Sequence, residues 1–380
     1  MRNCVLIIIT SLFLMSCEAS EPTEILRVAS FNVAMGMAEQ GQLSKALARS
    51  DDARLLQLAE ILHRVQPDIV LLNEFDYDPG TDAAALLNKN YLHKPYPHHF
   101  RAAVNTGLDS GLDLDGDGST GGPGDAWGFG HFPGQYGMLV LSRYPVIAGK
   151  SRTFQNFPWS SLPAARRPLN ADGSPFYSDE TWRLLRLSSK SHWDVVIELD
   201  GRELHLLAHH PTPPVFDGPE NRNSLRNFDE IRFWREYTGP GDVSFIIDDQ
   251  GRSGGLESAA GFVIAGDFNA DPHDGDSEPG AIDQLLNADW INGQCIPVSK
   301  GGQTAAENQA GINRRHRGNP AADTADFNDQ RTGNLRLDYV LPSANLQVTG
   351  CGVFWPAEGE DGADLVQMSD HRLVWLDIAF

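Results

Sequence analysis

Each of six apolar stretches of the chain carries an acid, an amide or an imidazole at or near one end. In chain order these residues are Asn32; Glu74, preceded by Asn73; His209 and His210; Asp267 and Asn269; Asp338; and Asp370 with His371. A single polar residue after a strand is usually a turn residue that bonds its own backbone. Asp338 differs, because it lies within an apolar run, where a carboxylate needs a partner such as a histidine. Together the six stretches predict one polar edge of a β-sheet that lines a cleft.

The residue types at this predicted edge are suited to metal-assisted chemistry. Oxygen ligands from Asn32, Glu74, Asp267, Asn269 and Asp370 suit a hard divalent cation such as Mg²⁺ or Mn²⁺. Two histidines with acidic neighbours suit proton transfer. A cation that neutralises phosphate and a base that activates water are the groups that hydrolyse phosphoesters. Gly266, before Asp267, is expected to leave room for the approach to the metal.

The elements that must position these residues alternate between strands and helices in the first part of the chain. The strands are expected at Ile25–Phe31, Ile69–Leu72, Met138–Ser142, Trp193–Leu199, Glu203–Ala208, Gly261–Ala265, Leu335–Leu341 and Leu373–Ala379. Helices are expected at Asp51–Val65, Asn227–Tyr237 and Ala281–Asn287. The pattern predicts one mixed α/β domain over residues 25–380. Its large size is attributed to long insertions at Asn105–Gly134, Gln155–Ser178 and Ser299–Thr332.

The composition limits the classes of partner. The 380 residues are 41% hydrophobic and carry a formal net charge of −21, which is typical of a globular, acidic protein. An acidic chain repels polyanions unless a basic patch or a bound cation intervenes, so its charge argues against tight binding of nucleic acid. Lys190 and His192 precede a strand, where they face either a phosphate or solvent.

The N-terminus predicts export. Arg2 precedes an apolar segment that is too short to span a bilayer, and Leu14-Met15-Ser16-Cys17 resembles a bacterial lipobox. Residues 1–16 are therefore expected to be a signal peptide and residues 17–24 a tether, with lipid on Cys17 anchoring the protein in the periplasm or at the cell surface. The alternative is ordinary cleavage near Ala19. Cys295 and Cys351 either pair in this oxidising environment or remain thiols.

The motifs GDFN (Gly266–Asn269) and SDH (Ser369–His371), downstream of Asn32 and Glu74, resemble those of the endonuclease/exonuclease/phosphatase superfamily. This group contains DNase I, AP endonucleases, inositol polyphosphate 5-phosphatases and neutral sphingomyelinases. The resemblance runs from Phe31 to His371 and implies a DNase I-like fold, a four-layer α/β sandwich with two packed mixed sheets. It implies a metal-dependent phosphoesterase with Mg²⁺ or Mn²⁺ as cofactor, acting on a phosphate ester.

The resemblance also implies residue roles. Metal binding falls to Asn32, Glu74 and Asp370, and catalysis to His210, Asp267, Asn269, Asp338 and His371. Asp338 is expected to polarise His371, and Asp267 and Asn269 to orient water and hold phosphate. Two features depart from or complicate the family pattern: Asn73 replaces the usual Gln, and His209 competes with His210, which the following Pro-x-Pro favours.

A second metal site is considered at the loop that carries Asp113, Asp115 and Asp117. Their spacing resembles the first half of an EF-hand calcium loop, but Gly124 occupies the position of its closing Glu. The loop therefore either binds Ca²⁺ or is a flexible acidic segment.

Three functions stay open from the sequence. The first is a monomeric phosphodiesterase or phosphatase acting on a small organic phosphate or a lipid head group, with no protein partner. The second is an endonuclease, and the third a non-catalytic, calcium-stiffened surface-binding lipoprotein.

Overall fold

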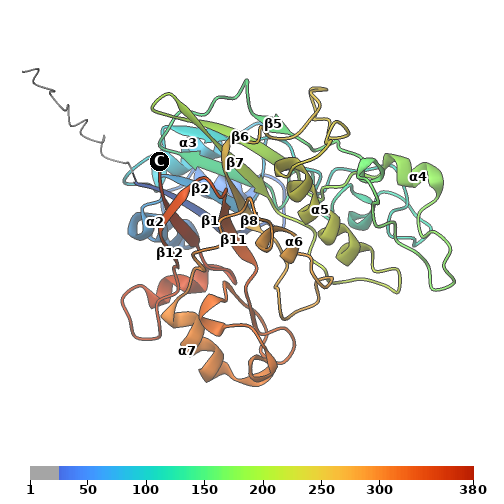
Figure 1. The fold of residues 1–380 in the computed structure, drawn as a ribbon. Coiled ribbons are helices and arrows are strands. Elements are labelled where there is room, and N and C mark those ends of the chain that lie inside the picture. The colour runs from blue at the N-terminus through green and yellow to red at the C-terminus, as the bar shows by residue number, and fades with distance from the viewer. Residues whose placement is uncertain (1–24) are drawn as a thin grey trace, which may run out of the picture.

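Two mixed β-sheets form the centre of the computed structural model, which describes residues 25–380 (Figure 1). In spatial order the first sheet contains β12 (Gln347–Val353), β13 (Val374–Ala379), β1 (Ile25–Met35), β2 (Ile69–Phe75), β4 (Met138–Ser142) and β3 (His98–Phe100). The second contains β11 (Asp338–Pro342), β8 (Gly261–Asp267), β7 (Arg202–His209), β6 (His192–Leu199) and β5 (Arg152–Thr153). Each sheet has one parallel pair, β1 with β2 and β7 with β8, among antiparallel neighbours.

Alternating side chains bury both faces of these sheets. In β1, Leu26 and Val28 enter the core between the two sheets, whereas Ala29 and Phe31 enter a second core on the outer face. This is the period of two that a β-strand imposes on its side chains. Strands whose two faces are both buried therefore have near-continuous apolar sequences.

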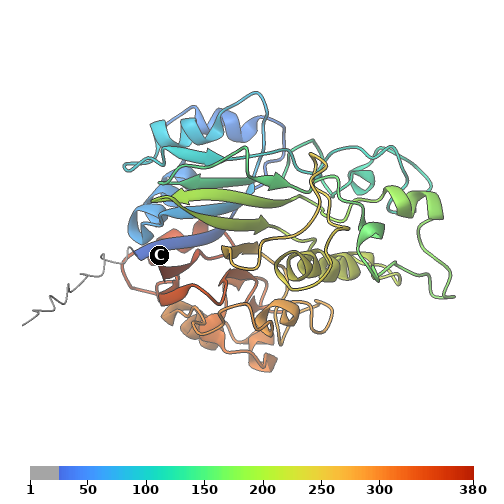
Figure 2. The same cartoon turned by 45° about the horizontal axis from the view of Figure 1, so that its top comes forward.

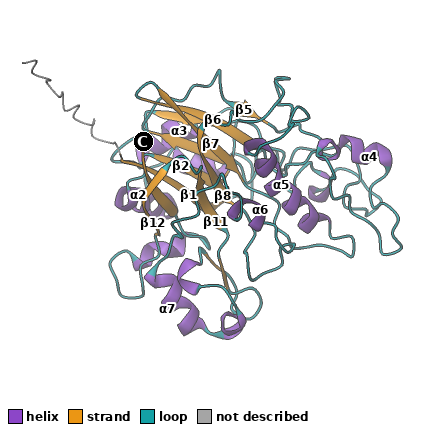
Figure 3. Cartoon of the chain, viewed as in Figure 1, coloured by secondary structure: helices purple, strands orange, loops and turns teal. Residues whose placement is uncertain are grey.

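Helices cover the outer face of each sheet, which makes four layers (Figures 2 and 3). The first sheet is covered by α1 (Gln42–Leu47), α2 (Ala53–Val65), α3 (Ala83–Asn90) and the 3₁₀ turn η5 (Ala363–Met368). The second is covered by α5 (Arg222–Thr238), α6 (Asp283–Leu286) and the segment around η2 (Trp159–Ser161). The predicted four-layer α/β sandwich is confirmed.

Residues 299–332 are more ordered than the sequence predicted. The expected insertion contains α7 (Lys300–Gln309), η3 (Gly311–Arg315), η4 (Pro320–Ala322) and β9 (Ala325–Asp326), which pairs with β10 (Asn334–Leu335). These elements form the orange lobe around α7 in Figure 1. The prediction of a single strand at Leu335–Leu341 is therefore wrong. The segment forms two strands, β10, which pairs with β9, and β11, which pairs with β8.

The remaining helical elements are short. The 3₁₀ turn η1 (Pro123–Asp125) lies in the first insertion, and α4 (Asp179–Leu184) begins directly after the second; both lie outside the sheets. Cys295 and Cys351 form a disulfide that ties the segment after α6 to β12, which decides the alternative left open by the sequence.

Membrane attachment is untested by the described part of the chain. Within residues 25–380, no helix has the length and apolar character needed to span a bilayer. The predicted signal peptide, the tether and Cys17 lie outside the described residues.

Candidate active site

The site forms where the ends of strands from both sheets meet. Asn32 of β1 lies in register with Asn73 of β2, and in the other sheet Asp338 of β11 lies opposite Asp267 of β8. The Asn32 Nδ2 atom donates a 2.9 Å hydrogen bond to Asp267 Oδ2, which joins the two sheets. The strand β1 does not end at Asn32 as expected, because it continues through an irregularity to Met35.

Asp267 is the centre of the site, and its side chain is 1% exposed. Besides Asn32, its Oδ2 atom faces two imidazoles: His210 Nε2 lies 3.4 Å away and His371 Nε2 lies 3.6 Å away. The Oδ1 atom accepts the backbone N–H of Asn269 at 2.9 Å. Burial raises the pKa of Asp267, whereas the charge of His371 acts in the opposite direction.

His371 and Asp338 form a buried acid–imidazole pair. The Nδ1 atom of His371 lies 2.8 Å from Asp338 Oδ2. Thr324 donates its hydroxyl to the same carboxylate oxygen at 2.8 Å. Burial disfavours the charged imidazole, but Asp338 and Asp267 raise the pKa of His371 to about 10. His371 is therefore held in its protonated form, with Nε2–H directed toward Asp267.

His210 has the opposite character. Burial and the positive charges of Lys190 and His371 hold the pKa of His210 well below its ordinary value. The site thus places beside the same carboxylate two imidazoles whose pKa values are shifted in opposite directions, an arrangement that separates acid and base roles. His209 lies instead among aromatic rings, with its ring centroid 4.3 Å from that of Phe268.

The predicted metal ligands differ in how well they fit a cation. Glu74 is half-buried, and burial raises the pKa of its carboxyl, although the charges of His371 and Lys190 oppose this. Such a carboxylate, with the neighbouring amide and carboxylate oxygens of Asn32 and Asp267, is a donor set that suits Mg²⁺ or Mn²⁺. Asp370 is exposed at the rim of the site.

The tightest acid-and-histidine group at the site is not the predicted metal set. Asp267, Asp338 and His371 have candidate ligand atoms within 4.8 Å of one another. Because Asp338 and His371 already bond to each other, Glu74 is the carboxylate that is most available to a metal ion. Asn269 is half-buried, and its Nδ2 donates to the backbone oxygen of Pro211 at 3.2 Å, next to His210.

A model of the "Endonuclease/Exonuclease/phosphatase family" matches residues 29–371. The chain belongs to this family. It is accordingly a metal-dependent phosphoesterase, a hydrolase that acts on ester bonds. No curated protein matches the sequence.

Several solved structures resemble the chain at low identity. An endonuclease/exonuclease/phosphatase from Beutenbergia cavernae is 18% identical, with a TM-score of 0.52 over 94% of this chain and 72% of that one. A family protein from Leptotrichia buccalis is 14% identical over 93% of this chain and 100% of that chain, with a TM-score of 0.46. The human Nocturnin catalytic domain is 16% identical over 94% of both chains, with a TM-score of 0.44. The Beutenbergia structure supports the family's fold for this chain.

Lys190 is a member of the site that the sequence left undecided. It is 5% exposed, and its ammonium group has no hydrogen-bond or ion-pair partner within residues 25–380. Burial lowers its pKa, while the charges of Glu230, Glu74 and Asp267 oppose this. A buried cation without a direct partner, among the acids of a phosphoesterase site, is suited to bind a phosphate oxygen. Its position two residues before β6 was the only signal in the sequence.

Three further residues support the site; Asn73 and Ser369 stand out in the sequence only as parts of motifs, and Thr324 does not stand out. Asn73 accepts the backbone N–H of Asp267 at 3.1 Å and donates to the backbone oxygen of His209 at 3.2 Å. The shorter amide in place of Gln thus holds the two sheets together. Thr324 supports Asp338, and Ser369, the first residue of SDH, donates to the backbone oxygen of Asn32 at 2.8 Å.

Two expectations about neighbouring residues are wrong. A Cβ atom at Gly266 would lie 2.1 Å from the backbone oxygen of His209. Glycine is therefore needed here for the close approach of the neighbouring strand, and not for the approach of a metal ion. His192 faces neither phosphate nor solvent, because it is 1% exposed and its Nε2 lies 2.9 Å from the backbone oxygen of Glu230.

The loop considered for calcium does gather its acids. Ligand atoms of Asp113, Asp115 and Asp117 lie within 4.8 Å of one another. Backbone N–H groups of the same loop already satisfy them; Gly116 and Gly118, for example, both donate to Asp113. Calcium binding at this loop stays a prediction.

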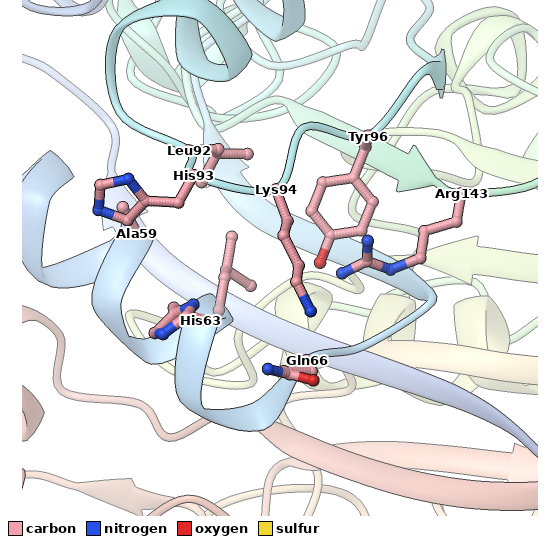
Figure 4. A pocket seen from close by; sticks show the side chains of 9 residues that line it. Ala59, His63, Gln66, Leu92, His93, Lys94, Tyr96 and Arg143 are labelled. Carbon is pink, nitrogen blue, oxygen red and sulfur yellow. The ribbon is translucent and has the colours of Figure 1, made fainter.

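The pocket shown in Figure 4 lies apart from the site, where α2 faces the segment around His93. His63 and His93 approach each other there, with their ring centroids 6.1 Å apart. Its cavity volume is about 10 Å³, which is too small for a substrate group.

Proposed function

We propose that this phosphoesterase hydrolyses a small organic phosphate or a lipid head group by attack of an activated water. The observation that carries this proposal is the convergence of two imidazoles, those of His210 and His371, on the same oxygen of the buried Asp267 carboxylate. A metal ion held by Asn32, Glu74 and Asp370 would neutralise charge on the phosphate. Lys190 would add a second positive charge for the phosphate oxygens.

The side chains of the site divide the remaining work. Asp267, held by Asn32 and by the backbone of Asn269, orients the attacking water and accepts its proton. His371 directs its Nε2–H toward the reaction centre, and Asp338 stabilises the positive charge of the imidazole. His210 is neutral and can accept or share a proton, while Asn269 holds the phosphate.

The small-substrate proposal rests on charge. A nuclease contacts several phosphates and therefore needs an extended basic surface, which a net charge of −21 does not favour. One buried lysine and a metal ion provide local positive charge, which suffices for a single phosphate group.

The first test is hydrolysis of a generic phosphodiester and a phosphomonoester, each with Mg²⁺, Mn²⁺, Ca²⁺ or EDTA. We expect turnover of at least one substrate with Mg²⁺ or Mn²⁺ and loss of turnover with EDTA. Folded protein that turns over neither would contradict the proposal. A panel of plasmid DNA, RNA, nucleotides, inositol phosphates and phospholipids then identifies the class. Faster cleavage of plasmid DNA than of the small phosphates would favour the endonuclease alternative.

We also propose that the protein is exported and anchored in the periplasm or at the cell surface by lipid on Cys17, and that it acts as a monomer. The Cys295–Cys351 disulfide supports an oxidising compartment. Mass spectrometry of the protein from its native membrane tests the anchor. Release in a form cleaved after Cys17, without lipid, would argue against it.

A further inference from the structure

A second pocket lies outside the active site, between the lobe around α7 and the loop that follows Asn269. It has a volume of about 320 Å³. The polar side chains in its walls are those of Asp274, Glu307, Asn313, Arg314, His316 and Asp323. The volume is at the lower end of the range for small-molecule sites in proteins. None of these residues belongs to the catalytic set.

Asp323 is the unusual member of this second pocket. It is only 7% exposed, and its carboxylate has no hydrogen-bond or ion-pair partner within residues 25–380. Burial and the nearby charges of Asp271 and Asp274 raise its pKa to about 8. This carboxylate lies in the wall of the pocket, where its oxygens accept no hydrogen bond from the described residues and are available to a ligand.

The two neighbouring acids are held in fixed positions. Asp271 Oδ1 accepts the backbone N–H groups of His273 and Asp274 at 2.7 and 2.8 Å. Asp274 Oδ2 accepts the backbone N–H of Gly318 at 2.8 Å. The loop Asp271–Asp276 therefore holds ordered carboxylates whose negative charges act on Asp323.

Positive charge opposes these acids only weakly in the described part of the chain. The Arg317 Nε atom lies 3.9 Å from Asp274 Oδ1, and the Arg317 side chain is 78% exposed. Arg314 has no ion-pair partner within residues 25–380 and is exposed. The buried end of the pocket is therefore acidic, and its exposed rim carries a free guanidinium.

The spacing of the acids favours an organic cation over a bare metal ion. A Ca²⁺ ion binds oxygens at about 2.3–2.6 Å, so its ligands lie within about 5 Å of one another. These acids are not among the acid-and-histidine groups of residues 25–380 whose ligand atoms lie within 4.8 Å. An ammonium group at the end of a short chain has three donors and fits a pocket of this size.

We propose that this second pocket binds a small primary amine, with the ammonium group against Asp323 and Asp274. The proposal does not depend on the substrate of the active site. The amine is either a free ligand or the amine end of a phosphorylated amino alcohol. The second source is included because Asp323 is next in the sequence to Thr324, whose hydroxyl donates to Asp338 of the active site.

Calorimetric titration of the full chain with ethanolamine tests the pocket, and ethylene glycol serves as the neutral control of similar size. We expect saturable binding of ethanolamine with a Kd of about 1 mM or tighter, and none of ethylene glycol. Equal heats from both compounds, or no binding of ethanolamine, would overturn the proposal. Tight binding of Ca²⁺ that ethanolamine does not displace, and that Asp323→Asn abolishes, would make the pocket a metal site and also overturn it.

Asp323→Asn should weaken ethanolamine binding about tenfold or more, because an amide keeps the shape of the side chain but cannot become the carboxylate that pairs with an ammonium group. The matched control is Asp276→Asn, since Asp276 is exposed in the same loop and does not line the pocket. Ala306→Trp fills the pocket from α7 without changing a charge, and it should also abolish binding. If Asp323→Asn fails to fold, this second variant alone tests whether ethanolamine binds in the pocket. Unchanged binding in either folded pocket variant would refute the assignment.

Kinetics distinguishes the two sources of the amine. If the amine belongs to the substrate, the protein has a lower KM for phosphoethanolamine than for ethyl phosphate, and Asp323→Asn removes the difference. If the amine is a separate ligand, ethanolamine changes the turnover of ethyl phosphate at saturating concentration. Either result supports the pocket. Inactivity toward both monoesters bears on the proposed function and not on the pocket, because the calorimetric result still stands.

Discussion

His371 Nδ1 and Asp338 Oδ2 lie 2.8 Å apart, although the two residues are 33 positions apart in the chain. The Asp338 carboxylate is buried and also accepts the Thr324 hydroxyl, while its Oδ1 atom has no partner among the described residues. The carboxylate therefore both orients the imidazole and stabilises its positive charge. A second acid–imidazole pair, Asp194 with His205 at 2.7 Å, lies elsewhere in the same sheet.

Asp338→Asn should lower kcat about a hundredfold or more, because the amide cannot stabilise a charged imidazole. The measurement is turnover of the best phosphoester at saturating metal, with circular dichroism to verify the fold. His205→Asn is the control, since it breaks the other acid–imidazole pair without touching the cleft. If the two variants lost equal activity, the loss would reflect general damage to the sheet, and Asp338 would have no special role.

Glu74→Gln should abolish stabilisation by metal. For the wild-type protein, Mn²⁺ at about 100 times its Kd should add about 3 kcal/mol to the free energy of unfolding. The variant keeps the size of the side chain but lacks the charge that a divalent cation requires. Thermal unfolding with Mn²⁺ and with EDTA measures both effects.

The control for this experiment is Glu360→Gln, which removes a surface carboxylate that pairs with Lys300. It should respond to Mn²⁺ as the wild type does. A Glu74→Gln protein that still gains stability from Mn²⁺ would show that other residues hold the metal, with Asp267 as the first candidate.

Lys190→Met should lower kcat/KM about a hundredfold, because a positive charge near the phosphate is lost. Its stability should not fall, since methionine fills a buried position without a charge. The control is Lys150→Met, which removes an exposed lysine paired with Glu203. Full activity in Lys190→Met would exclude the ammonium group from phosphate binding, and a large loss of stability would make Lys190 a structural residue.

The positions of the strand ends could be predicted from the sequence, because at each of them an apolar run is followed by a polar residue. That pattern placed Asn32, Glu74, Asp267 and Asp338 near one edge, since β-strands with buried faces leave few other positions for such groups. The preference for His210 over His209 came from a resemblance and not from physics. Both histidines are buried, and only the contact of His210 with Asp267 separates them.

The rest of the site depends on contacts between distant segments. From its local sequence, Lys190 resembles an exposed residue at the start of a strand. It is buried by segments distant in the chain, and no local pattern indicates that burial. The first turn of α7 contains Gly301 and Gly302, and glycine is a poor helix former. A Cβ at Gly301 would lie 2.3 Å from the backbone oxygen of Trp355, so tertiary packing, not local propensity, selects these glycines.

His192 should make the fold sensitive to acid. It is buried, and burial lowers its pKa from 6.5 to about 4. As the pH falls below 6.5, the imidazole becomes protonated in the unfolded chain but stays neutral in the folded chain. The free energy of unfolding therefore decreases between pH 6.5 and about 4. A shift of this size corresponds to about 3 kcal/mol.

His192→Gln stays neutral and keeps a donor for the backbone oxygen of Glu230. Its free energy of unfolding, measured with urea, should therefore fall by about 3 kcal/mol less than that of the wild type between pH 7 and pH 4. His63→Gln, at an exposed position on α2, should follow the wild type. Parallel pH profiles for wild type and His192→Gln would mean that the folded protein accommodates a charged imidazole at this position.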